Sequence, residues 1–250
     1  MNIAIIGYGR MGHMVEQVAA GRGHHIVAVI DAANSADMDG EVFRSADVAI
    51  EFSVPATAES NCRRALACGV PVVSGTTGWS AELEQLRADL SHESPALMWS
   101  SNYSLGVNLF FIINRYVSRL MGGFAQYVPV VNEVHHIHKL DHPSGTAISL
   151  AQDVVNRVDG LSCWSEEPAG ADALVVNHAR IAETPGTHTV RWSSDVDYIA
   201  IEHCAHSRQG FALGAVMAAE WIRGRHGFYT MDNMMRDIVP ASLIELTETI

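Results

Sequence analysis

The pattern of hydrophobic and polar residues changes twice along the chain. In residues 1–104, short runs rich in β-branched residues alternate with segments of helical periodicity, which predicts a parallel sheet with crossover helices. In residues 105–213, one long apolar helical segment is followed by several strand-like runs, which is typical of an α+β domain. Residues 214–250 are helical again. The chain therefore divides into three segments.

These segments predict an α/β protein with a Rossmann-type, doubly wound parallel sheet and a second α+β domain built on an open mixed sheet. We expect residues 1–104 and 214–250 to form a dinucleotide-binding domain. Residues 105–213 would form a separate second domain. The expected strands lie in residues 2–7, 24–31, 46–53, 70–75, 96–101, 126–136, 173–181, 187–194 and 197–205.

Charge and composition exclude several classes of function. The formal net charge of −12 argues against a nucleic-acid or anionic-membrane partner. No apolar run approaches the roughly 20 residues of a membrane span. The N-terminal residues show neither the basic region nor the small-residue cleavage site of a secretory signal, and the four cysteines form no C-x-x-C pair. We therefore expect a cytoplasmic protein with reduced thiols.

The segment "GYGRMG", residues 7–12, has the G-x-G-x-x-G spacing between a predicted strand and a predicted helix. Gly7 would make the tight turn, Gly9 would admit a pyrophosphate, and Gly12 would pack the helix on the strand. Roughly 20 residues further, Asp31 ends the next strand, where a carboxylate binds the adenosine ribose. The predicted cofactor contacts in these two segments are Gly7, Tyr8, Gly9, Arg10, Met11, Gly12 and Asp31.

Two further loops follow the predicted fourth and fifth strands, whose carboxyl ends should face the same cofactor. Each is a weak signal by itself, and both are also compatible with ordinary turns. The residues that we expect to contact the cofactor here are Gly75, Thr76, Thr77, Ser100, Ser101, Asn102 and Tyr103.

The stretch "NEVHHIHKLDHPSGTA", residues 132–147, concentrates groups that carry chemistry. It holds four of the 13 histidines and Lys139, the only lysine in the chain. Three interpretations remain open from the residues alone. The stretch could bind a metal, although Pro143 disfavours the helical spacing of zinc motifs, and we predict none. It could be a histidine-rich surface loop. The third interpretation is an acid/base site in which Ser144 caps a helix whose first N–H groups bind an anion.

The assembled motifs resemble the 4-hydroxy-tetrahydrodipicolinate reductase (dihydrodipicolinate reductase) family. The most specific part is "EVHHIHKLDHPSGTA", close to the family signature E-x-H-H-x-x-K-x-D-x-P-S-G-T-A, and "GYGRMG", "GTTG" and "SNYSLGVN" agree in order and spacing. The resemblance implies that His135 is a proton donor and acceptor and that Lys139 is a proton donor. It implies that His136, Ser144 and the Gly145–Thr146 backbone hold a small dicarboxylate substrate, and that the protein is a homotetramer.

The implied reaction is hydride transfer from NAD(P)H to the cyclic dipicolinate intermediate of lysine and diaminopimelate biosynthesis. We expect NADH to be preferred and NADPH to be tolerated, because Asp31 would repel a 2′-phosphate while Arg10 offers one nearby cation. Two alternatives stay open: another two-domain nicotinamide dehydrogenase for a small amino dicarboxylate, such as an aspartate dehydrogenase, and an NAD(P)-binding sensor without turnover.

Overall fold

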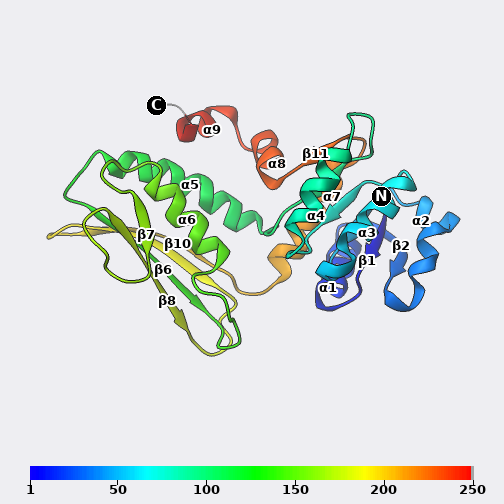
Figure 1. Ribbon diagram of the computed structural model, residues 1–250, viewed down its shortest axis with the longest axis horizontal. Coiled ribbons are helices and arrows are strands. Elements are labelled where there is room, and N and C mark those ends of the chain that lie inside the picture. The colour runs from blue at the N-terminus through cyan, green and yellow to red at the C-terminus, as the bar shows by residue number, and fades with distance from the viewer. Residues whose placement is uncertain (249–250) are drawn as a thin grey trace. The chain divides into compact units, whose positions relative to one another are not determined.

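The computed structural model describes residues 1–248 and divides into two compact units (Figure 1). The first unit contains Met1–Leu105 and Arg208–Ile238, and the second contains Gly106–Ser207 and the residues from Val239 onward. The sequence pattern predicted that all of residues 214–250 belong to the first domain. In the structure, the residues from Val239 onward group with the second unit instead. Helix α8 ends at Ile238, and Pro240 lacks the N–H that would continue it.

A six-stranded parallel sheet forms the centre of the first unit, in the order β11-β5-β4-β3-β1-β2. Helices connect consecutive strands, as parallel pairing requires. The elements of this unit are β1 (Asn2–Ile6), α1 (Arg10–Gly21), β2 (His25–Ile30), the 3₁₀ helix η1 (Ala32–Asp39), α2 (Glu41–Arg44), β3 (Val48–Glu51), α3 (Pro55–Ala67), β4 (Val72–Ser74), α4 (Ser80–Asp89), β5 (Leu97–Trp99), α7 (Gln209–Ile222), β11 (Phe228–Tyr229) and α8 (Met231–Ile238).

The strands of this sheet are mostly apolar and the central ones are largely buried, with Glu51 at the end of β3 and Ser74 at the end of β4 as buried polar exceptions. All four residues of β3 are fully buried, and α3 starts with Pro55 at its first position, where the missing N–H costs nothing. Helix α7 is rich in alanine and packs against α1 and β3, which its small buried side chains permit. These features confirm the Rossmann-type parallel sheet.

The second unit is a five-stranded mixed sheet in the order β10-β9-β6-β8-β7. The central strand β6 pairs antiparallel with β9 and parallel with β8. Helices α5 and α6 cover one face of this sheet, which buries a core cluster that includes Phe110, Leu150 and Trp192 (Figure 1). The elements are α5 (Leu105–Gly122), β6 (Val128–His135), α6 (Gly145–Val155), β7 (Cys163–Ser165), β8 (Ala173–Arg180), β9 (Thr187–Ser193), β10 (Tyr198–Cys204) and α9 (Ala241–Glu248).

The predicted elements agree with these in type, and the second domain is confirmed as α+β on a mixed sheet. Two strands were not predicted, β7 and β11, which contain three and two residues. Neither segment contains an apolar run like those around the equally short strands β4 and β5, so the sequence pattern does not reveal it. Among residues 1–248, no helix is long and apolar enough to cross a membrane.

Gly7 and Gly9 provide a matched pair for testing the glycine turn. A Cβ at Gly7 would lie 2.2 Å from the Phe52 carbonyl oxygen, and its φ of +88° disfavours any side chain, whereas a Cβ at Gly9 meets nothing within 4 Å. Gly7→Ala should lower the free energy of unfolding by roughly 1–3 kcal/mol or more. Gly9→Ala meets no steric conflict and should lower it by less, about 0.5–1 kcal/mol, because alanine is a poorer N-cap than glycine. Thermal melting without ligand measures both, and equal melting temperatures for the two variants would contradict the assignment.

Candidate active site

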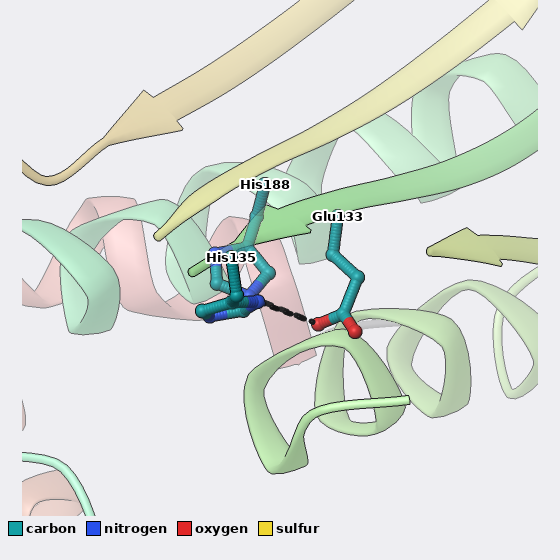
Figure 2. A group of neighbouring side chains, drawn as sticks. All are labelled: Glu133, His135 and His188. Carbon is teal, nitrogen blue, oxygen red and sulfur yellow. Dashed lines mark ion pairs between the residues drawn. The ribbon is translucent and has the colours of Figure 1, made fainter. Parts of the chain in front are cut away.

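The alternation of β6 directs two functional side chains to the same side of the sheet. Val131, Glu133 and His135 are buried on the face that the helices cover, whereas the intervening residues are only partly buried. Glu133 lies in register with His188 on β9. Figure 2 shows the three side chains grouped together, with His135 Nδ1 3.3 Å from Glu133 Oε2. The ring of His188 meets that of His135 edge-on, with centroids 5.0 Å apart.

Glu133 is fully buried, and its carboxylate connects several segments. Its Oε2 accepts a hydrogen bond from the Ser144 N–H at 3.1 Å, and its Oε1 accepts hydrogen bonds from Arg180 at 3.2 Å. Burial alone would raise the pKa of Glu133, but the contacts from His135 and Ser144 outweigh it and lower the pKa to about 2. The carboxylate is therefore ionised at neutral pH and faces the imidazole of His135.

His188 is held in its neutral form. Burial, together with the nearby charge of His135, lowers the pKa of His188 to about 4. Its Nε2 lies 3.1 Å from the hydroxyl of Ser144 and 3.7 Å from Glu133 Oε2. A neutral His188 packs beside His135 without a repulsive second charge.

Helix α6 begins where the sequence predicts it. The hydroxyl of Ser144 accepts a hydrogen bond from the Ala147 N–H, and Gly145 and Thr146 form the first turn. Gly145 is exposed, and a Cβ there would meet nothing within 4 Å. The positive end of the helix dipole thus opens to solvent at a residue without a side chain, which suits an anionic group.

Lys139 lies in the loop between β6 and α6, and Arg180 holds this loop in place. The Lys139 ammonium donates to both carboxylate oxygens of Asp141 at 2.8 Å. Arg180 Nε donates to the Lys139 carbonyl at 3.2 Å, and its Nη2 donates to the Asp141 carbonyl at 2.6 Å. One guanidinium therefore joins the loop that carries the lysine to the buried Glu133.

The histidines of the 132–147 stretch point to different partners, so they do not form one metal site. His138 approaches Glu183 at 3.4 Å, and His142 Nδ1 lies 2.7 Å from Glu166. Glu133, His135 and His188 do have ligand atoms within 4.8 Å of one another. The guanidinium of Arg180 on Glu133 makes that position unfavourable for a cation, and the donors fit acid/base chemistry instead.

In the first unit, the glycine turn lines a cleft of about 530 Å³. Its walls include Gly7, Gly9, Asp31 and Asn61. A Cβ at Gly12 would lie 2.4 Å from the Gly7 carbonyl oxygen, so the turn and α1 approach as closely as the sequence predicts. Gly9 is exposed at the N-cap of α1 and makes no side-chain cap, which leaves the helix N-terminus open. These residues fit a bound dinucleotide pyrophosphate.

Asp31 follows β2 at the rim of this cleft. Its carboxylate accepts a hydrogen bond from the Ala32 N–H at 2.8 Å, while Asn34 accepts one from the Asp31 N–H at 2.7 Å. This reciprocal cap fixes the start of η1. Arg10 is exposed at the first position of α1.

Two of the predicted cofactor contacts, Tyr103 and Thr76, have hydroxyl groups that are hydrogen-bonded inside the protein. The Tyr103 hydroxyl donates inside the sheet to the carbonyls of Ser74 and Met98, at 2.9 and 3.0 Å, so its ring joins β4 to β5. The Thr76 hydroxyl donates to buried Glu51 at 2.8 Å. Both hydroxyls support the loops after β4 and β5, as expected for buried polar groups, and the cofactor contacts of these two residues stay predictions.

The remaining predicted cofactor contacts lie in the segments that follow β1, β4 and β5. They are Tyr8, Met11, Gly75, Thr77 and Ser100–Asn102. Tyr8 lines the cleft, and its hydroxyl is bonded to Glu16. A Cβ at Gly75 would meet the ring of Phe52 at 2.0 Å, so this position requires glycine. The hydroxyl of Ser100 bonds within its own loop to the Asn102 carbonyl.

Sequence reasoning did not include four residues in the site: Glu51, Glu133, Arg180 and His188. A carboxylate inside an apolar strand was an available signal for Glu51, and the shared strand face with His135 was one for Glu133. Arg180 and His188 carry no local signal, since they reach the site only through the pairing of β8 and β9 with β6.

The low pKa of His188 predicts how stability depends on pH. The unfolded chain binds a proton near pH 6.5 and the folded chain near pH 4, so this stability is complete above pH 6.5 and is lost as pH falls toward 4. The loss should be roughly 3 kcal/mol. Chemical unfolding of the wild type between pH 4 and 7 should show this slope, and His188→Gln should flatten it. His138→Gln, at an exposed position, should leave the slope unchanged; equal slopes in all three proteins would refute the assignment.

Two family descriptions match the chain in sequence. "Dihydrodipicolinate reductase, N-terminus" matches residues 1–103, and "Dihydrodipicolinate reductase, C-terminus" matches residues 106–235. The 4-hydroxy-tetrahydrodipicolinate reductase of Christiangramia forsetii is 43% identical over 240 residues, covering 95% of this chain and 99% of the relative. The enzyme of the same name from Archaeoglobus fulgidus is 33% identical over 261 residues, covering 94% and 100%.

A solved structure has the same fold. The dipicolinate-bound dihydrodipicolinate reductase of Paenisporosarcina sp. TG-14 superposes with a TM-score of 0.71 at 18% identity, covering 96% of this chain and 99% of that one. The sequence matches span both units and agree with the resemblance inferred from the motifs. The chain belongs to the dihydrodipicolinate reductase family, the NAD(P)H-dependent oxidoreductases that act in lysine biosynthesis.

Proposed function

We propose that the second unit binds the cyclic dicarboxylate intermediate and that His135 supplies the proton that completes its reduction. The observation that carries this proposal is the contact of buried Glu133 with His135, beside the N-terminus of α6. A related reductase with bound dipicolinate supports a small dicarboxylate as the ligand. The first unit, residues 1–105 and 208–238, binds the nicotinamide cofactor.

The reaction needs one hydride and one proton. The hydride, with its electron pair, passes from the reduced nicotinamide to a ring carbon conjugated with the imine, and the resulting electron density takes up a proton. Glu133 faces Nδ1 of His135, which leaves Nε2 as the nitrogen that transfers the proton. Nε2 lies beside Gly186, where a Cβ would come within 3.0 Å, so this position favours glycine.

The two substrate carboxylates need cationic or N–H partners. Gly145 and Thr146 in the first turn of α6 offer backbone N–H groups and the positive helix end, with Ser144 capping that turn. His136 follows His135 directly and adds a ring donor. Lys139 carries a compact positive charge, which is paired with the Asp141 carboxylate. It would release this carboxylate, bind a substrate carboxylate in its place, and can also donate a proton.

NADH is the preferred cofactor. The carboxylate of Asp31 lies in the lining of the cleft, where it accepts hydrogen bonds from a ribose 2′-hydroxyl and repels a 2′-phosphate. Ala32 adds no positive charge, and Arg10 is the nearby cation that lets NADPH be tolerated.

A homotetramer would form through the sheet of the second unit, as in the family that the motifs resemble. The face of β6 opposite the helices carries Val128, which is 62% exposed, and its register places Tyr198 of β10 on the same face. The ring of Tyr198 lies under the guanidinium of Arg191 at 3.7 Å. Sedimentation at several concentrations tests the tetramer.

Reductase activity and the roles of two residues are tested together. Purified protein should oxidise NADH only when the preceding synthase of the pathway makes the substrate in situ. His135→Gln, which keeps shape but transfers no proton, and Lys139→Arg, which keeps charge, should each lower kcat by roughly 10²-fold or more. Their affinity for NADH should be little changed. Near-normal turnover in Lys139→Arg would show that the lysine provides only charge, and oxidation by oxaloacetate plus ammonia would support the aspartate dehydrogenase alternative.

The cofactor preference has its own test. We expect kcat/KM for NADH to exceed that for NADPH, and Asp31→Asn, which keeps the oxygen that caps Ala32, should reduce this ratio about tenfold, or 1.4 kcal/mol. Arg10→Ala should selectively weaken the use of NADPH. A wild-type kcat/KM for NADPH more than about tenfold above that for NADH would show that Arg10 outweighs Asp31.

A further inference from the structure

A second cluster of ligating side chains lies at the surface of the second unit. His142 belongs to the loop between β6 and α6, Glu166 directly follows β7, and His178 lies on β8. All three side chains are partly exposed, so an ion from solvent can reach them. None of the three has a role in the reaction proposed above.

The three groups converge on one point. His142 Nδ1 lies 2.7 Å from Glu166 Oε2, and His178 Nε2 lies 2.9 Å from the same oxygen. The imidazole rings stack with centroids 4.5 Å apart and an angle of 23° between their planes. All three ligand atoms lie within 4.8 Å of one another. Ligands of a tetrahedral zinc ion with bonds of about 2.0–2.1 Å are separated by about 3.4 Å, so small side-chain shifts are sufficient.

We propose that His142, Glu166 and His178 form a binding site for a divalent transition-metal ion, Zn²⁺ in particular, with the fourth position open to water. Two imidazoles and one carboxylate are a ligand set that zinc accepts in proteins. Calcium and magnesium prefer sites made entirely of oxygen ligands, which excludes them here. The net charge of −12 attracts a cation.

Two neighbouring groups show why this cluster is distinct. The Glu133 group already holds Arg180, whose guanidinium opposes a second cation. The His138–Glu183 pair, at 3.4 Å, belongs to no group of three ligands within residues 1–248. The cluster of His142, Glu166 and His178 offers three ligand atoms. Its ion pairs are formed within the cluster and include no lysine or arginine that would compete with a metal ion.

A bound ion would join three segments that are distant in the sequence. It would fasten the loop at His142 to β7 and β8, two residues before Ser144 caps α6. The ion therefore has a structural role in holding this loop, and the inference stands whether or not the proposed substrate roles are correct.

The test is zinc binding to the full-length protein, purified without a histidine tag and stripped with a chelator. Competition with a chromophoric chelator should give one Zn²⁺ per chain with a micromolar or tighter Kd, and zinc should raise the Tm by a few degrees. His178→Ala and Glu166→Gln should each weaken binding roughly tenfold or more. His138→Ala is the matched control, a surface histidine with one carboxylate neighbour, and should bind zinc as the wild type does.

Thermal melting without metal verifies that every variant is folded. Equal zinc affinity in His178→Ala and the wild type would overturn the proposal, as would a wild-type Kd weaker than about 100 μM. A loss of zinc binding in His138→Ala together with unchanged binding in Glu166→Gln would place the ion elsewhere and equally refute it.

Discussion

The buried carboxylate of Glu133 is the interaction on which the second unit depends. Removing a carboxylate from water is costly unless donors surround it, and here a backbone N–H, a guanidinium and an imidazole do so. Each donor comes from a different segment, so satisfying this one charge fixes the start of α6, the end of β8 and the ring of His135. The geometry of the site is therefore a consequence of solvating Glu133 inside the protein.

The strand order determines which side chains reach Glu133. β6 is central, with β9 antiparallel on one side and β8 parallel on the other, and Glu133 lies in register with His188 and His178. His188, 55 residues away in the sequence, lies 3.7 Å from the Glu133 carboxylate, whereas the ring of His178 contacts Glu166. On the β9 side, burial lowers the pKa of His188 and favours its neutral form beside His135.

The fold was largely predictable because its signals are local. Alternating apolar runs, Pro55 at the start of α3, and Ser144 before α6 each indicate an element from adjacent residues alone. The catalytic candidates His135 and Lys139 were also found from a local motif. Arg180 and His188 could not be found in this way, because their contacts arise from strand pairing across tens of residues. The burial of the Tyr103 hydroxyl was not predictable for the complementary reason: the sequence shows a hydroxyl near the predicted cofactor loop, but not that it donates hydrogen bonds inside the sheet.

The first unit uses the same physical device as the second. Glu51 ends β3, is fully buried, and accepts hydrogen bonds from Ser53, Ser74 and Thr76, which lie in or beside the loops after β3 and β4. A carboxylate with several donors holds these loops together more firmly than neutral pairs would, since charge-assisted hydrogen bonds are roughly twice as strong. In both units an acidic residue inside a central strand organises the segments at the carboxyl end of that strand. In the first unit this charge acts together with the buried rings of Trp79 and Tyr103, and in both units it adds to the rigidity that a binding site for a cofactor or a dicarboxylate requires.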